Sequence, residues 1–162
     1  MRKRVYVETT IVSYLTARPS VNLIIAAHQE ITRQWWQQRR RAYDLFVSQF
    51  VVREAGKGDA AAADARLALL ADLPQLRVEP EAIALADALV TDGVLPGGAA
   101  VDSLHLAMAT VHGMDVLLTW NCRHLANADI LMRAARYVRR KAYDLPIVCT
   151  PEELMGEKEG EP

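Results

Sequence analysis

Three acidic side chains stand at places in this sequence where a fold could gather them around a metal ion. Glu8 directly follows the apolar run Val5-Tyr6-Val7, and Glu54 lies six residues after Ser48, which ends another apolar run. Asp102 lies within an alanine-rich apolar stretch. Carboxylate oxygens suit Mg²⁺ and Mn²⁺, and such ions promote the hydrolysis of phosphate esters. The three acids therefore predict a metal-dependent hydrolase, provided that the fold brings them together.

Each acid also has a plain structural explanation. Glu8 could cap a following helix, because a carboxylate accepts hydrogen bonds from the free amides at a helix start. Glu54 could be a solvent-facing helical residue, as most glutamates are. Asp102 is harder to explain in this way, because a carboxylate among apolar residues is costly to bury unless it is paired or bound to a metal. The functional interpretation depends on the three acids meeting in one site.

The cysteines and histidines do not indicate a zinc site. Cys122 and Cys149 form no CxxC pair, and we expect both to be buried or partly buried free thiols. The four histidines lack the HxxxH spacing of a helical zinc site. We therefore expect any bound metal to be a hard cation held by oxygen atoms.

Short apolar runs that alternate with amphipathic stretches predict the elements that must position these residues. The strand candidates are residues 4–7, 45–48, 75–78, 116–119 and 147–149, and helical patterns run through residues 23–35, 63–70, 85–89, 101–111 and 127–141. In the first pattern Leu23, Ala27, Ile31 and Trp35 form one apolar stripe. Such alternation is typical of a parallel sheet covered by helices, with the functional site at the carboxyl ends of the strands. We therefore predict one three-layer α/β domain with a short central parallel sheet of about five strands.

Length and composition agree with one folded domain. The chain has 162 residues, of which 51% are hydrophobic and 24% charged. We expect the domain to span residues 1–155 and an acidic, flexible tail to span residues 156–162. No apolar run approaches the roughly 18 residues that a membrane span requires, and Glu8 interrupts the first run too early for a signal peptide. We therefore expect a cytoplasmic protein.

Two features of the sequence could bind nucleic acid. The net charge is only −1, but basic residues cluster around Arg39–Arg41 and again in residues 133–141. Such clusters can be solvated helix faces or a local basic rim for a phosphate backbone. The pair Trp35-Trp36 could stack on bases. We favour Trp35 as a core residue, because it continues the apolar stripe, and Trp36 as an interface residue.

Together these motifs resemble the PIN-domain family, and within it the VapC-type toxins of bacterial toxin–antitoxin pairs. The resemblance extends from Tyr6 to about Leu154. Its motifs are an acid after the first strand (Val7-Glu8-Thr9-Thr10-Ile11-Val12), a serine at a strand end followed by a helical glutamate (residues 48–54), an aspartate in a helix (residues 102–107), and the strand of residues 113–119. No one motif is specific, but their order and spacing together are.

The resemblance implies a metal-dependent endoribonuclease that hydrolyses RNA phosphodiester bonds. Its catalytic residues would be Glu8, Glu54, Asp102 and Asn121, and the three acids would bind Mg²⁺ or Mn²⁺. Hydrogen bonds from Thr9, Ser48 and Thr119 would orient these groups, and Arg53, Arg123 and His124 would contact the substrate. His124 could equally be a structural loop residue. The resemblance also implies a small antitoxin protein as partner and a homodimeric assembly.

Two positions depart from the pattern of the family. The first acid is usually aspartate, and Glu8 has one more methylene group, which adds about 1.5 Å of reach. The fourth acid is also usually aspartate, and Asn121 can offer an amide oxygen but no charge. We therefore expect one firmly bound ion, with any second ion arriving together with the substrate phosphate.

Two other functions compete with this one. A metal-dependent phosphatase would need a nucleophilic aspartate after the first strand, where this chain has Glu8-Thr9-Thr10. A non-catalytic module that binds RNA or protein would follow if Asn121 abolished cleavage. No glycine-rich phosphate loop is present in the sequence, which argues against a nucleotide-binding switch.

Overall fold

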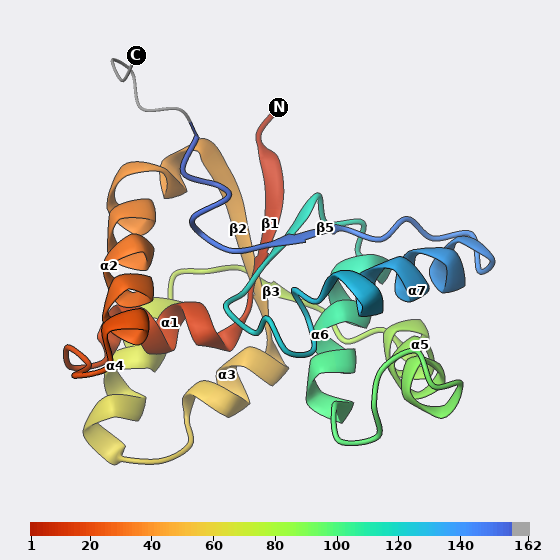
Figure 1. Cartoon of the computed structure of the whole chain (residues 1–162), viewed down its shortest axis with the longest axis horizontal. Coiled ribbons are helices and arrows are strands. Elements are labelled where there is room, and N and C mark those ends of the chain that lie inside the picture. The colour runs from red at the N-terminus through yellow and green to blue at the C-terminus, as the bar shows by residue number, and fades with distance from the viewer. Residues whose placement is uncertain (157–162) are drawn as a thin grey trace.

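A five-stranded parallel sheet forms the centre of the computed structural model, which describes residues 1–156 (Figure 1). The strands are β1 (Lys3–Val7), β2 (Tyr43–Ser48), β3 (Gln75–Leu76), β4 (Val116–Leu118) and β5 (Ile147–Cys149). Their order across the sheet is β3-β2-β1-β4-β5, and every neighbouring pair is parallel. All five predicted strands are present, although β3 ends two residues earlier than expected. The predicted tail lies, apart from Gly156, outside the described residues.

Helices cover the sheet on both sides, as the predicted three-layer architecture requires. They are α1 (Thr9–Thr16), α2 (Leu23–Gln38), α3 (Gln49–Ala55), α4 (Ala60–Leu70), α5 (Pro80–Thr91), α6 (Ala100–Val111) and α7 (Ala128–Arg139), with a short 3-10 turn η1 (Arg40–Ala42) before β2. In Figure 1, α1, α2 and α4 gather on one side of the strands, and α5, α6 and α7 gather on the other. None of the helices in the described part of the chain has the length and apolar character to cross a bilayer.

The residues that end two neighbouring strands also begin the next helices. Glu8 is the N-cap of α1, where its carboxylate accepts a hydrogen bond from the Thr10 amide. Ser48 is the N-cap of α3, where its hydroxyl accepts from the Phe50 amide. The capping expected for Glu8 is therefore real, and it does not exclude a second role. Because β1 and β2 are adjacent and parallel, both polar caps lie at the same edge of the sheet.

The core is built from the strands and the inner faces of the helices. Val5, Tyr6 and Val7 of β1 and Leu117 and Leu118 of β4 are fully buried, as expected for strands that are covered on both faces. Such strands hold their ends rigidly, so the polar residues that follow them are well positioned.

The tryptophan pair belongs to the core. Trp35 has no exposed surface and Trp36 is only 8% exposed. The prediction for Trp35 is confirmed. Trp36 is covered by the chain itself and lies under the guanidinium group of Arg40, 4.9 Å from the ring centroid. Neither ring is open for stacking on a base.

Two expectations about burial are wrong. Leu23 and Ala27, placed in the inward stripe of α2, are both exposed, Leu23 to 85%, because the start of this helix lies beyond the part that packs on the domain. Cys122 is also exposed, since it lies in the surface loop after β4, whereas Cys149 at the end of β5 is buried. Burial raises the pKa of the Cys149 thiol to about 12.

Candidate metal centre

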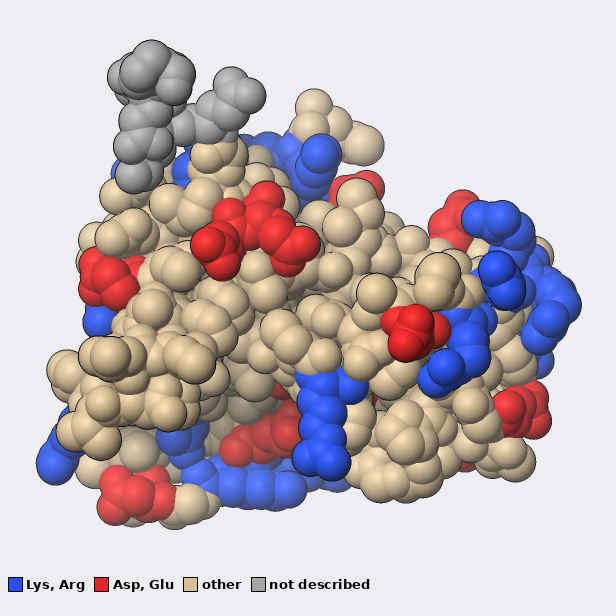
Figure 2. Space-filling model, viewed as in Figure 1, with Lys and Arg blue, Asp and Glu red and all other residues tan. Residues whose placement is uncertain are grey.

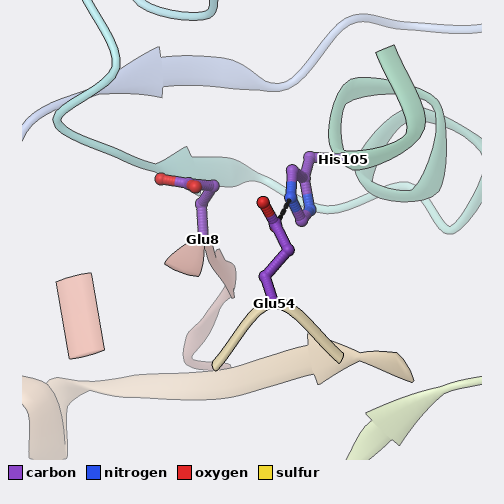
Figure 3. Close-up of side chains that lie close together, drawn as sticks. All are labelled: Glu8, Glu54 and His105. Carbon is purple, nitrogen blue, oxygen red and sulfur yellow. Dashed lines mark hydrogen bonds and ion pairs between the residues drawn. The ribbon is translucent and has the colours of Figure 1, made fainter. Parts of the chain in front are cut away.

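Glu8, Glu54 and His105 meet at the carboxyl edge of the sheet. They come from the end of β1, from α3 and from α6, and Figure 3 shows their side chains converging. One potential ligand atom from each residue lies within 4.8 Å of the other two. Two of the three predicted acids are thus brought together, and a histidine joins them.

Glu8 is a buried carboxylate that is held by neutral donors. Its side chain is 4% exposed, and Oε2 accepts hydrogen bonds from the Thr119 hydroxyl at 2.7 Å and from both the amide and the hydroxyl of Thr10. Within residues 1–156, no lysine or arginine forms an ion pair with Glu8, and no donor contacts Oε1. One oxygen is therefore fixed, and the other remains available to a ligand.

Glu54 is fixed in the same way. Its Oε1 accepts hydrogen bonds from the Thr9 hydroxyl at 2.8 Å and from His105 Nε2 at 2.6 Å. In the described part of the chain no donor contacts Oε2. Burial by itself would raise the pKa of Glu54, but the hydrogen bond from His105 and the electrostatic interaction with that ring, with smaller help from Thr9 and Lys57, lower that pKa overall. Glu54 is therefore ionised at neutral pH.

His105 is fully buried and uses both ring nitrogens inside the protein. Nε2 bonds to Glu54, and Nδ1 lies 2.8 Å from the Tyr6 hydroxyl, which in turn lies 2.7 Å from Ser48 Oγ. Because the carboxylate can only accept, Nε2 carries a proton, and a neutral ring then accepts at Nδ1 from Tyr6. Burial raises the pKa of Tyr6 far above its usual value, which keeps this donor protonated. The geometry makes His105 a group that orients Glu54.

The sequence reasoning missed His105, and a local signal was available. His105 follows Asp102 by three residues, so the two side chains lie one turn apart on the same side of α6. The HxxxH pattern compares the positions of histidines alone, so it does not detect a histidine that is spaced one helical turn from an aspartate. A polar residue within Leu104-His105-Leu106-Ala107 would have to be buried and therefore paired.

Asp102 forms a second cluster beside the first. Its Oδ1 accepts from Asn121 Nδ2 at 2.9 Å, and its Oδ2 lies 2.8 Å from His124 Nδ1. Asp102 does not belong to the group of three whose ligand atoms lie within 4.8 Å of one another. The two clusters are connected through Thr119. The backbone N–H of Asn121 donates to Thr119 Oγ1 at 2.9 Å, and the Thr119 hydroxyl donates to Glu8.

The remaining predicted residues lie around these two clusters. Thr9 and Thr119 contact the glutamates directly, whereas Ser48 reaches Glu54 only through Tyr6 and His105. Arg53 and Arg123 are exposed and form no ion pair with any residue of the described chain. In Figure 2, acidic side chains lie in a hollow low in the view, over the region of α3, with lysine and arginine side chains around it.

The donor set fits a hard divalent cation. Two carboxylates each offer a free oxygen, and the nearby imidazole is occupied by hydrogen bonds within the protein. Such oxygen ligands favour Mg²⁺ or Mn²⁺ over zinc, which would select nitrogen or sulfur ligands.

Comparisons with known proteins identify a structure that shares the fold of this chain. No protein-family model and no curated protein sequence matches the chain. A chain in the crystal structure of VapBC2 from Rickettsia felis, bound to a DNA fragment from their promoter, superposes with a TM-score of 0.55. The alignment covers 91% of this chain and 98% of that chain at 14% identity. This likeness shows that the two chains share one fold, as the resemblance seen in the sequence implies.

Proposed function

We propose that this protein is a divalent-metal-dependent ribonuclease of the VapC-like type. The observation that carries the proposal is the Glu8 carboxylate, which is buried beside Glu54 without any lysine or arginine partner in the described chain. Leaving a buried charge without a compensating charge is costly, and a bound cation removes that cost. The fold shared with the VapBC2 chain supplies independent support. Glu8 follows β1 and Ser48 ends the adjacent parallel strand β2, and ligands of such sheets bind at the carboxyl ends of the strands.

The residues divide into ligands and groups that orient them. Glu8 Oε1 and Glu54 Oε2 would contact the ion directly, and Asp102 would contact it through water. The hydroxyls of Thr9 and Thr119 orient the glutamates, and His105 holds Glu54. A bound Mg²⁺ or Mn²⁺ would lower the pKa of the attacking water and neutralise charge that develops on the phosphate.

The substrate and partners follow from the sequence resemblance and the fold. RNA phosphates would contact Arg53 and Arg123, which are exposed and free of ion pairs within residues 1–156, and His124, whose side chain is 24% exposed. The structural neighbour is a VapBC2 complex, and by analogy a small antitoxin would bind this chain, which would act as a homodimer in the cytoplasm.

Asn121 favours a second candidate function, that of a non-catalytic binding module. Its amide group donates to Asp102 where the family pattern has a fourth acid, so this site carries one negative charge fewer. If that charge is needed for cleavage, the protein would bind RNA without cutting it.

The deciding experiment compares the wild-type protein with Glu54→Gln on labelled RNA in Mg²⁺, Mn²⁺ or EDTA. We expect metal-dependent cleavage by the wild type and a loss of about 100-fold or more in Glu54→Gln, since one of two direct ligands loses its charge. The matched control is Glu79→Gln, which changes a half-buried glutamate that precedes α5 and makes no side-chain hydrogen bond to the start of that helix. Wild-type binding without metal-dependent cleavage would favour the binding module. Phosphate release from small esters with intact RNA would favour a phosphatase.

A further inference from the structure

A stripe of arginine side chains runs along the outer face of α7. Arg133, Arg136 and Arg140 are spaced three and four residues apart, so they share one face, and all three are exposed. Arg139 and Lys141 are exposed beside them. None of these five cations forms an ion pair with an acid of residues 1–156. Figure 2 shows blue side chains gathered at the right of the molecule, where Figure 1 places the end of α7.

The stripe borders a hollow of about 460 Å³ whose other wall is formed by residues 92–94, directly after α5. The guanidinium Nη2 of Arg133 donates a hydrogen bond to the Val94 carbonyl at 3.2 Å, which holds this guanidinium group at the wall of the hollow. The Tyr137 hydroxyl donates to Asp92, and the guanidinium carbon of Arg140 lies 5.6 Å from the Tyr137 ring centroid. Three arginines therefore face one aspartate that already accepts a hydrogen bond, and the hollow keeps a positive charge.

This charge is not required by the packing of α7. The inner face of the helix is formed by Ile130, Ala134 and Val138, all of which are buried. A solvated helix face normally mixes charges of both signs, because like charges three or four residues apart repel. Beyond Asp129, every charged residue of α7 is a cation. The helix thus carries a repulsion that an anionic partner would relieve.

The position of α7 connects the stripe to the metal centre. The loop before this helix carries Asn121 and His124, both of which contact Asp102. In Figure 2 the acidic hollow and the basic side chains at the end of α7 are visible on the same face. A strand of RNA that enters the acidic hollow can therefore continue along this face of the protein to the arginine stripe of α7.

We propose that Arg133, Arg136 and Arg140 bind the phosphate backbone of RNA outside the cleavage site. This inference rests on the proposed ribonuclease function and extends it with a second contact surface for the same substrate. Guanidinium groups suit this role, because they donate pairs of hydrogen bonds to phosphate oxygens. At 1.5 Å per residue the stripe is about 10 Å long, which matches about three phosphates of a stacked strand.

Binding of single-stranded RNA in EDTA tests the stripe independently of catalysis. Fluorescence anisotropy would compare the wild type with Arg136→Ala/Arg140→Ala at several salt concentrations. We expect the double variant to bind RNA about five- to tenfold more weakly than the wild type. The slope of log affinity against log salt concentration should become about 1.4 less steep, because two phosphate contacts are lost. The matched control is Lys3→Ala/Arg41→Ala, which removes two exposed cations at the amino ends of β1 and β2, neither of which forms an ion pair within residues 1–156.

Cleavage in Mn²⁺ supplies a second measurement. The α7 variant should show a raised KM on long RNA and unchanged turnover of a dinucleotide, which is too short to reach the stripe. The inference would be overturned if the α7 variant and the control variant lost the same amount of RNA affinity. It would also be overturned if the α7 variant kept the RNA affinity and the salt dependence of the wild type. A third contradicting result would be an α7 variant that binds RNA as the wild type does but no longer binds an acidic peptide, because the stripe would then be a protein-binding surface. A wild-type protein that binds RNA through the stripe but never cleaves it would instead contradict the proposed function.

Discussion

Glu8 and Glu54 each have one carboxylate oxygen that is fixed by the protein and one that is open. The donors are hydroxyl, amide and imidazole groups rather than lysine or arginine. Neutral donors fix the orientation of a carboxylate without cancelling its charge, so both negative charges remain available to a cation. At the scale of single residues, this choice of donors is what we expect of the proposed metal site rather than of a structural ion pair.

The hydrogen bond from Tyr6 to His105 gives a prediction about metal affinity. Tyr6→Phe removes the donor to His105 Nδ1 and leaves the ring in the core, so Glu54 should lose part of its orientation. We expect Mn²⁺ affinity to fall about 10- to 100-fold, as is usual when an outer-shell partner of a ligand is lost, with a stability cost of about 1–3 kcal/mol. Isothermal titration calorimetry of the metal-free protein would measure the affinity.

Tyr43→Phe is the matched control for this prediction. Its hydroxyl makes no side-chain hydrogen bond within the described residues, and Tyr43 begins β2, at the opposite end of that strand from Ser48. Unchanged Mn²⁺ affinity in Tyr6→Phe, or an equal loss in Tyr43→Phe, would show that His105 does not orient Glu54.

Besides α3, which carries Glu54, the elements that build the site are β1, β4 and α6. The strand β1 ends at Glu8, β4 is followed by Thr119 and Asn121, and α6 carries both Asp102 and His105. The pairing of Val7 with Leu118 sets β1 and β4 in register, which places Glu8 and Thr119 side by side. The hydrogen bond between them depends on this register.

The position of β4 inside the sheet predicts a contrast in stability between two strands. Leu117 in β4 has no exposed surface, whereas Ile147 in β5, at the edge of the sheet, is 65% exposed. We expect Leu117→Ala to lower the free energy of unfolding by about 2–5 kcal/mol, because it leaves a cavity. Ile147→Ala should change it by about 0.5 kcal/mol or less, as an exposed substitution. Urea unfolding would measure both, and similar costs would contradict the assignment of β4 to the core.

The whole molecule has a net charge of −1, but its charges are separated in space. The buried Glu8 and the half-buried Glu54 converge at the carboxyl edge of the sheet, and cations that form no ion pair within residues 1–156 lie along the outer face of α7. An anionic polymer and a divalent cation would each find a region of opposite charge, which the net charge does not reveal.

Metal binding should therefore stabilise the entire fold. A cation that binds only the folded state adds about 2.7 kcal/mol at a concentration 100 times its Kd, so Mn²⁺ should raise the Tm of the wild type. Glu8→Gln/Glu54→Gln should abolish this rise and should be at least as stable as the wild type in EDTA, because two neighbouring negative charges are removed. Differential scanning calorimetry would test both points. An equal rise in the two proteins would place the ion elsewhere.

Much of this organisation could be predicted from the sequence. The period of the apolar residues determines strands and helices locally, so all five strands were located and the parallel three-layer fold followed from their alternation with helices. Glu8 and Ser48 were identifiable as site residues for the same reason, because the residue after a buried parallel strand lies at the functional edge whatever the rest of the chain does.

The partners of each polar side chain were decided only by the tertiary structure. Whether His105 faces Glu54, and whether Asp102 contacts Asn121 and His124, depends on how α6 is rotated against α3 and against the loop after β4. Side-chain hydrogen bonds act over about 3 Å, and a helix rotates by about 100° per residue, so a small change in packing would exchange one partner for another. Periodicity in the sequence fixes which side of a helix is buried, and the packing of the entire core fixes what that side meets.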